Sequence, residues 1–182
     1  MDTLIATAVR RAQPSDAAAL TALVNRAYAV EAAFVDGDRV AAGEMAELIT
    51  AGGFLVLEYP HGIAAAVRFQ APGERAELPA SAAYFGMLSV HPELQSMGLG
   101  RRMVQVVEAM AEASGAAVMR LRMINLREEL NRWYKSLGYR EVGTSPYTGR
   151  GVKRPCHFIE RAKPLVAATP VYASRALGAA VI

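Results

Sequence analysis

Apolar residues recur at helical spacing in four stretches of the chain, and each stretch predicts an amphipathic helix. The helices are predicted over residues 16–33, 43–51, 99–114 and 126–137. Gly115 and Gly138 follow the last two stretches, where glycine commonly ends a helix. The apolar positions that define the helix predicted over residues 99–114 are Leu99, Met103, Val106, Val107 and Met110.

Between these stretches the chain carries short runs rich in β-forming residues. Residues 117–125 alternate methionine or leucine with arginine, which is typical of a strand. Residues 82–90 are apolar throughout, and such a run predicts a central strand that is covered on both faces. The other predicted strands are residues 4–12, 54–58, 62–70, 139–143 and 156–161.

The predicted order is β-α-α-β-β-β-α-β-α-β-β. This order favours an α/β fold with one layer of sheet and helices on both faces. A chain of 182 residues is typical of one domain, which we place at residues 1–163. Residues 164–182, which are punctuated by proline and then rich in alanine, are interpreted as a C-terminal tail with no assigned role.

Composition narrows the function classes. Hydrophobic residues make up 53% of the chain and charged residues 20%, which excludes a disordered protein. The net charge is only +3 and the basic residues are scattered, which argues against a nucleic-acid binder. The single cysteine excludes an internal disulfide, and three dispersed histidines predict no metal site. No leader-like start and no membrane-length apolar run occur, so we expect a cytoplasmic protein without membrane contact.

The stretch "HPELQSMGLGRRM" is typical of an anion-binding loop that opens a helix. Gly98 and Gly100 allow close approach to the free N–H groups of the first turn, and Arg101 and Arg102 add positive charge. A mononucleotide loop would need Lys and Ser or Thr after Gly100, and a dinucleotide fingerprint would need glycine at Met103. The residues themselves therefore predict a site for a diphosphate-sized anion, with a plain tight turn as the alternative.

The wider pattern narrows this choice. Val90, Pro92, Gln95, Gly98 and Gly100 form V-x-P-x-x-Q-x-x-G-x-G, which resembles motif A of the GCN5-related N-acetyltransferase (GNAT) superfamily. The later "WYKSLGY" resembles the helix-borne tyrosine and L-G-[YF] exit of that family, and the likeness spans residues 5–160. It implies an α/β (α+β) fold with a mixed sheet of about seven strands, flanked by helices and splayed at two central parallel strands.

The resemblance also implies acetyl-CoA as cosubstrate. In the family the backbone of the strand before motif A binds the pantetheine arm and polarises the thioester carbonyl, and the loop binds the pyrophosphate. Gly86 is consistent with a bulge that opens this strand for pairing. The residues that carry these contacts here would be Leu88, Ser89, Val90, Gln95, Ser96, Met97, Gly98, Leu99, Gly100 and Arg101.

Tyr134 is implied as the general acid that protonates the leaving thiolate; packing in the core is the alternative role. Asn125 is included among the cofactor contacts. It lies nine residues before Tyr134, whereas the family places its asparagine about seven residues before this tyrosine. A capping box with Glu128 is the other role that the spacing of Asn125 favours.

The implied reaction is acetyl transfer to a primary amine of a small molecule or a peptide, by direct attack in a ternary complex. No general base is identified; Glu31, Asp36 and Asp38 are candidates to bind a cationic substrate, or plain loop charges. The rivals are a non-catalytic acyl-CoA sensor and a transferase of another acyl group, with Arg122 or Arg127 meeting a carboxylate-bearing acyl chain. A homodimer is a further possibility.

Overall fold

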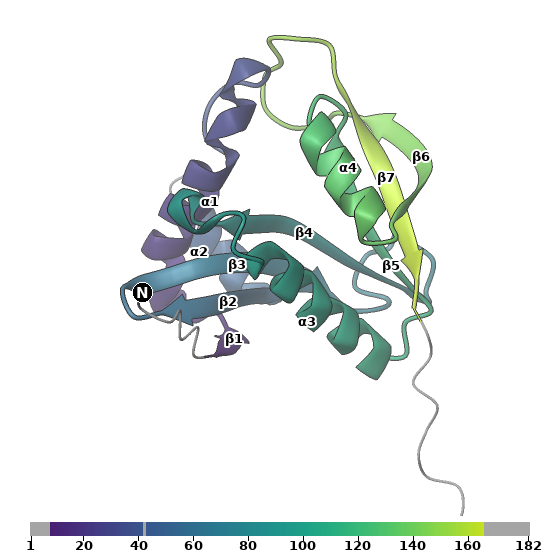
Figure 1. The fold of residues 1–182 in the computed structure, drawn as a ribbon, viewed down its shortest axis with the longest axis horizontal. Coiled ribbons are helices and arrows are strands. Elements are labelled where there is room, and N and C mark those ends of the chain that lie inside the picture. Colours follow the sequence, from purple (N-terminus) through teal and green to yellow (C-terminus); the bar gives the residue numbers. More distant parts are fainter. Residues whose placement is uncertain (1–7, 42, 166–182) are drawn as a thin grey trace, which may run out of the picture.

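The computed structural model describes residues 8–41 and 43–165 and contains one seven-stranded sheet (Figure 1). Its strand order is β1-β2-β3-β4-β5-β7-β6, and only β4 and β5 run parallel. The elements are β1 (Val9–Arg11), α1 (Ala17–Tyr28), α2 (Glu44–Thr50), β2 (Phe54–Tyr59), β3 (Gly62–Gln70), β4 (Ala82–Val90), α3 (Leu99–Ala113), β5 (Val118–Ile124), α4 (Glu128–Ser136), β6 (Arg140–Pro146) and β7 (His157–Pro164).

The predicted order of elements and the mixed sheet are confirmed, with shifts at several ends. The predicted first helix ends at Tyr28, and a 3-10 segment, η2 (Ala29–Ala33), continues it. Strand β7 runs to Pro164, and the N–H of Leu165 still donates to the carbonyl of Ala117 at 3.0 Å, two residues past the domain boundary expected at 163. Residues 1–7 and 166–182, which hold part of the predicted first strand and most of the predicted tail, lie outside the described residues.

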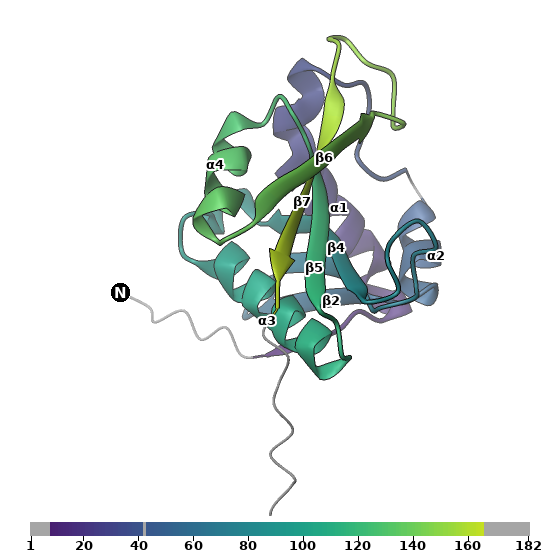
Figure 2. The same cartoon turned by 90° about the vertical axis from the view of Figure 1, so that its right-hand side faces the viewer.

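Helices cover both faces of the sheet (Figure 2). One core cluster joins α1 and α2 to β2 and β3, through residues such as Leu20, Met45 and Val56. The other joins α3 to β2–β5, through residues such as Met103 and Phe85. Because the core lies on both faces, the strands between them are buried on both faces, as the apolar run of β4 predicts.

The sheet parts in its middle, between β4 and β5. Only Ala82–Tyr84 pair with β5, at Val118–Arg120, and no pair follows farther along the two strands in the described residues. On the β3 side the register shifts, so that Met87 and Leu88 together oppose one residue, and Met87 takes a left-handed φ of 51°. The predicted opening beside Gly86 is therefore confirmed as a β-bulge.

Aromatic rings fill the wedge between the parted strands on the α4 side. The ring of Phe85, from β4, lies 6.1 Å from that of Tyr134 on α4 and 5.9 Å from that of Tyr139. The two tyrosine rings lie 5.8 Å apart, edge to face. Such tilted contacts are favourable for aromatic rings, so α4 packs against the opened sheet rather than closing it.

The buried guanidinium of Arg161, on β7, binds both α4 and the chain just after it. It donates to the carbonyl of Tyr139 at 2.9 Å and to the side chain of Asn131. A buried cation is stabilised only when its donors find acceptors, so these bonds hold α4 in one orientation over β7. Tyr134 lies on the helix that these bonds hold.

The loop between β6 and β7 reaches across to the segment that follows α1 (Figure 1). The N–H of Asp36 donates to the carbonyl of Gly151 at 2.8 Å, and the N–H of Lys153 donates to the carbonyl of Phe34 at 2.9 Å. The Lys153 ammonium also donates to the carbonyl of Ala32 at 2.9 Å. We call residues 147–153 the arch, because they join the two halves of the molecule above the parted strands.

Two kinds of feature are missing from the described part of the chain. None of its helices is long and apolar enough to cross a membrane. No group of three or more His, Cys, Asp or Glu side chains is arranged there to hold a metal ion.

A pair of adjacent glycines before β2 offers a test of the sheet. A Cβ on Gly53 would lie 2.1 Å from the carbonyl oxygen of Phe69, whereas one on Gly52 would meet nothing within 4 Å. Both residues have left-handed φ angles, so alanine at Gly52 is expected to cost about 1–2 kcal/mol from strain alone. Gly53→Ala should lower the free energy of unfolding, measured by urea titration, by clearly more than Gly52→Ala. Equal losses would contradict the close approach of β2 and β3.

Candidate functional site

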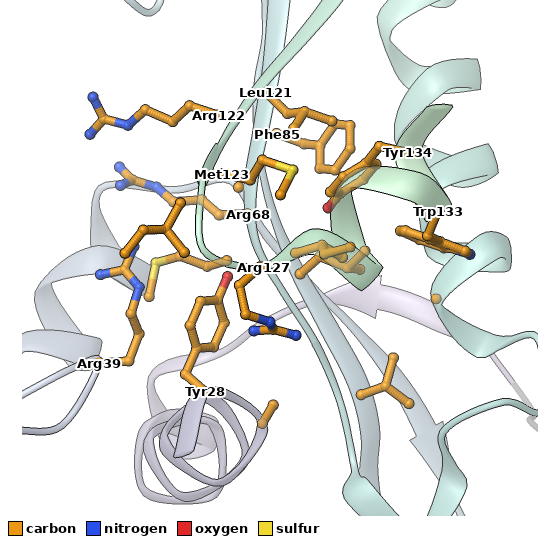
Figure 3. A pocket seen from close by; sticks show the side chains of 18 of the residues that line it. Tyr28, Arg39, Arg68, Phe85, Leu121, Arg122, Met123, Arg127, Trp133 and Tyr134 are labelled. Carbon is orange, nitrogen blue, oxygen red and sulfur yellow. The ribbon is translucent and has the colours of Figure 1, made fainter. Parts of the chain in front are cut away.

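A cavity of about 830 Å³ lies where β4 and β5 separate (Figure 3). It extends from the N-terminus of α3, along β4, to the end of α1 and the arch. Nine of the twelve residues proposed from the sequence line it: Leu88, Val90, Gln95, Ser96, Gly98, Leu99, Gly100, Arg101 and Tyr134. Ser89, Met97 and Asn125 do not.

The N-terminus of α3 forms one end of the cavity. The N-cap residue is Gly98, which has no side chain, so it offers no capping group to the N–H groups of the first turn. Ser96 and Gly98 both take left-handed φ angles, 64° and 82°, which turn the loop sharply into the helix. A Cβ on Gly98 would meet nothing within 4 Å, so the space beside that backbone is open. The partial positive charge of the helix end and the Arg101 guanidinium suit an anion at this position.

The end of β4 forms the cavity wall next to this loop. Leu88 is one of the two bulge residues, and β5 no longer pairs with the strand at this level. Its backbone groups are thus available to a ligand lying in the gap. The side chain of Gln95 donates to the carbonyl of Val90 at 3.3 Å and ties the loop to the strand.

Two of the proposed cofactor contacts point away from the cavity. The side chain of Ser89 is buried and donates to the carbonyl of Met87 at 3.1 Å, so this residue faces the gap only through its backbone. Met97 is 48% exposed at the surface of the loop. Any contact of its side chain with a ligand stays a prediction.

Asn125 does not cap α4. That helix begins at Glu128 with Arg127 at the N-cap position and no side-chain cap, so the predicted capping box is wrong. The Asn125 side chain instead accepts from the N–H of His157 at 2.9 Å, and its own N–H donates to the His157 carbonyl at 3.0 Å. It closes the β5–β7 ladder, a long-range partner that the local sequence does not reveal.

Tyr134 lies between the core and the cavity. It is 4% exposed, and Figure 3 shows its hydroxyl directed into the cavity. Burial raises the pKa of this phenol far above its usual value near 10. The group therefore stays protonated at any physiological pH and can donate one hydrogen bond into the cavity.

Trp133, which sequence reasoning placed only on the apolar face of α4, also lines the cavity. Its ring lies 3.6 Å from the position that a Cβ of Gly100 would occupy. The indole therefore packs against the start of α3 and borders the glycine loop. Its place next to Tyr134 in the sequence was the only available signal.

Of the three carboxylates proposed from the sequence, Glu31 is the one that the fold brings to the cavity. It is 7% exposed, and its carboxylate lies 3.6 Å from the Arg127 guanidinium and 3.4 Å from that of Arg150. Burial raises the pKa of Glu31, while these arginines oppose the shift. Asp36 and Asp38 do not line the cavity, and Asp36 pairs with Lys153 at 3.6 Å on the surface.

Together these groups form a path with distinct ends. An anion fits at the α3 end, an extended chain fits along β4, and a phenol and a buried carboxylate lie farther in. This arrangement can hold an extended phosphate-bearing ligand and present its far end to a proton donor and a proton acceptor.

The model of the acetyltransferase (GNAT) domain family matches residues 50–141, which is half of the chain. This match covers β2 to the start of β6, and so contains the β4 bulge, the glycine loop and α4. No curated protein sequence matches the chain.

Solved structures share the fold at low sequence identity. The structure of yncA from Salmonella typhimurium with its cofactor acetyl-CoA is 22% identical, covers 93% of this chain and 99% of its own, and has a TM-score of 0.69. An N-acetyltransferase from Staphylococcus aureus Mu50 is 16% identical, with coverages of 87% and 98% and a TM-score of 0.71. The ribosomal-protein-S18-alanine N-acetyltransferase from Escherichia coli is 18% identical, with coverages of 91% and 99% and a TM-score of 0.63.

Proposed function

The chain belongs to the GNAT acetyltransferase family, and from this membership we propose that it transfers the acetyl group of acetyl-CoA to a primary amine of a small molecule or peptide. The observation that carries the proposal is the continuous path from the uncapped N-terminus of α3, along the unpaired edge of β4, to the hydroxyl of Tyr134. Its two ends suit two groups of acetyl-CoA, the diphosphate and the thioester, which the pantetheine arm joins.

Acetyl-CoA would be held mostly by backbone. The N–H groups of Leu99 and Gly100 would donate to the diphosphate, with Arg101 adding charge. The unpaired edge of β4 would bind the pantetheine amides as an added strand. The N–H of Leu88, one of the two bulge residues, would polarise the thioester carbonyl.

Tyr134 would act on the leaving sulfur. When bound, acetyl-CoA supplies an acyl carbon that the amine nitrogen attacks, with loss of the carbon–sulfur bond. A phenol whose pKa is raised by burial is a weak acid, so its first contribution is a hydrogen bond to the departing thiolate. The phenol then gives its proton to the thiolate, because the same apolar surroundings make the thiolate more basic.

We assign to Glu31 the role of the general base that takes a proton from the acceptor amine. The amine must lose a proton for attack, and Glu31 is the buried carboxylate of this cavity in the described chain. A carboxylate whose pKa is raised is a stronger base than an exposed one, which suits this transfer. Sequence reasoning could not select it, because only the fold separates it from the neighbouring aspartates.

The first rival function is a non-catalytic acyl-CoA sensor, and the second is transfer of another acyl group. A calorimetric titration with acetyl-CoA, succinyl-CoA, propionyl-CoA, NADH and ATP separates these from the proposal. Selective binding of acetyl-CoA, followed by amine-dependent release of free thiol, supports the proposed reaction. Binding without turnover on any amine favours the sensor, and failure of the folded protein to bind any CoA thioester overturns the assignment.

Gly100→Leu tests the diphosphate site. The backbone here is helical and leucine is a better helix former than glycine, so the fold should persist. The larger side chain would fill the space between Trp133 and Val90 and should weaken acetyl-CoA binding about 100-fold, the equivalent of losing one or two charge-assisted hydrogen bonds. Gly143→Leu, at an open position on β6, is the control in the same calorimetric assay. If Gly100→Leu bound acetyl-CoA as tightly as the parent, the loop would be a tight turn and not a diphosphate site.

Tyr134→Phe tests the proton donor. The variant keeps the ring packing against Phe85 and Tyr139 and removes only the hydroxyl. We expect kcat to fall by about 10²-fold or more, in the range of general acid catalysis, with acetyl-CoA affinity nearly unchanged. Tyr59→Phe, outside the cavity, should behave like the parent. If Tyr134→Phe kept the parental kcat, Tyr134 would have only a packing role.

Glu31→Gln tests the base through its pH dependence. Glu31 accepts a proton only when it is ionised, so kcat at saturating acceptor should fall as pH drops through its pKa. Because burial raises that pKa, this acid limb should lie above the value near 4.5 of an exposed glutamate. In Glu31→Gln the limb should vanish and kcat should be low at every pH, whereas Asp38→Asn should keep the parental profile. A variant that retained both the limb and the rate would exclude Glu31 as the base.

A further inference from the structure

The inner half of the cavity carries an excess of arginine. Five arginines line it away from the glycine loop: Arg39, Arg68, Arg75, Arg122 and Arg127. Two glutamates accompany them, Glu31 and Glu129, and both pair with Arg127. The remaining positive charge is therefore not balanced by the acidic groups of the cavity wall.

Three of these arginines have no carboxylate within ion-pair distance in residues 8–41 and 43–165: Arg39, Arg68 and Arg122. Arg39 stacks on the ring of Tyr28 at 5.3 Å, and Arg122 stacks on that of Phe158 at 4.5 Å. Stacking holds the plane of a guanidinium and leaves its N–H edge free for an anion. Figure 3 shows the three side chains extending to the same side of the cavity.

Arg68 and Arg122 flank a gap in the sheet surface. Arg68 on β3 pairs with Gly86 on β4, and Arg122 lies two residues beyond Arg120, which pairs with Tyr84. The two arginines are thus at the level of Gly86, on either side of it. A Cβ on Gly86 would lie 3.1 Å from the Tyr84 ring, so this ring covers Gly86 on the face that carries the arginines. We call the part of the cavity beside this ring, with Arg68 on β3 and Arg122 on β5, the slot.

The slot is electrostatically unfavourable when empty of negative charge. The Nε atom of Arg68 is buried and has no hydrogen-bond partner among the described residues. Burial and the neighbouring Arg75 lower the pKa of Arg68, and this effect outweighs the opposite influence of Tyr84 and Glu74, so its cationic form is destabilised there. An anion in the slot would satisfy the orphaned donor and neutralise the repulsion.

This anion is not the diphosphate of the cosubstrate. Val67 and Phe69, on either side of Arg68, belong to the core beneath α3, so Arg68 points to the opposite face of the sheet. Leu121 and Met123 place Arg122 on that opposite face in the same way. The glycine loop opens α3 on the first face, so the slot lies on the acceptor side of the gap.

The arch also covers the acceptor side of the cavity. The arch contributes Tyr147, Thr148 and Gly149 to the cavity wall, and its backbone bonds to residues 34–36 close it above. Arg150 of the arch reaches down to Glu31 at 3.4 Å. Because the arch narrows the approach to this side of the cavity, it favours a small acceptor molecule.

We propose that the acceptor is a small amine that itself carries two carboxylates or equivalent oxyanions, with one anion bound between Arg68 and Arg122 and the other by Arg39. The amine would then lie beside Glu31. This inference rests on the proposed function and specifies its substrate class.

The test compares acceptors that differ by one charge. L-glutamate, L-glutamine and n-butylamine present two, one and no carboxylates, and L-aspartate with L-asparagine forms a second pair. Thiol release with saturating acetyl-CoA should give kcat/KM in the order dicarboxylate, amide, alkylamine, with each step about 10-fold or more, as expected for a charge-assisted contact. Amides or alkylamines that equal or exceed the dicarboxylates would overturn the proposal.

Variants of the two slot arginines test whether the preference for dicarboxylates arises in the slot. Arg68→Gln and Arg122→Gln should each raise KM for L-glutamate about 10- to 100-fold, the cost of one charge-assisted contact. They should change the constants for n-butylamine far less. Arg140→Gln, an exposed arginine on β6 outside the cavity, removes the same charge and should match the parent. If Arg68→Gln and Arg122→Gln instead altered the choice between acetyl-CoA and succinyl-CoA, the slot would bind the acyl chain and the proposal would be wrong.

Binding measurements separate this inference from the proposed function. Calorimetry of L-glutamate and L-glutamine, with CoA present, needs no turnover. If the protein binds L-glutamate more tightly than L-glutamine, and Arg68→Gln removes this preference, the slot is supported. If no amine is acetylated in that case, only the proposed function fails. Efficient acetylation of uncharged amines together with no binding of L-glutamate leaves the proposed function intact and overturns the slot.

Discussion

Strands β4 and β5 stop pairing after Tyr84, and the features of the site depend on this separation. A continuous ladder would satisfy the backbone groups of β4 internally and leave no edge for a ligand. Three local causes keep it open: the bulge at Met87 and Leu88, the aromatic wedge of Phe85 and Tyr134, and the Arg161 anchor that holds α4. Each comes from a different part of the chain, so the gap is a property of the whole fold.

The gap connects two faces of the sheet with opposite chemical tasks. On the α3 face an uncapped helix terminus and the Arg101 side chain suit a diphosphate. On the other face Arg68 and Arg122 flank Gly86, and Glu31 lies beneath the arch. Two negatively charged ligands can therefore approach from opposite sides without their charges meeting, and only the reacting groups need to come together near Leu88 and Tyr134.

Burial sets the chemistry of the groups that meet there. It raises the pKa of Tyr134 and of Glu31, so the phenol stays a donor and the carboxylate becomes a better base. It also makes the arginines of the slot depend on an anion for neutralisation. The same desolvation therefore accounts for the catalytic assignments and for the proposed acceptor class.

The order of elements followed from the sequence alone, because helical and strand periodicities are local and strong in segments such as 82–90 and 99–114. The glycine loop was proposed from its spacing and Tyr134 from the family resemblance, and both line the cavity.

The side-chain partner of Asn125, the burial of Glu31 and the arginine slot were not accessible from the sequence. The spacing of Asn125 favours a helix cap, yet its side chain pairs with His157, which is 32 residues away. Glu31 differs from Asp36 and Asp38 only through the burial that α1, the arch and Arg127 create. Arg68 and Arg122 reach the level of Gly86 only because three strands set their register around it, and register is decided by tertiary pairing that no local pattern encodes.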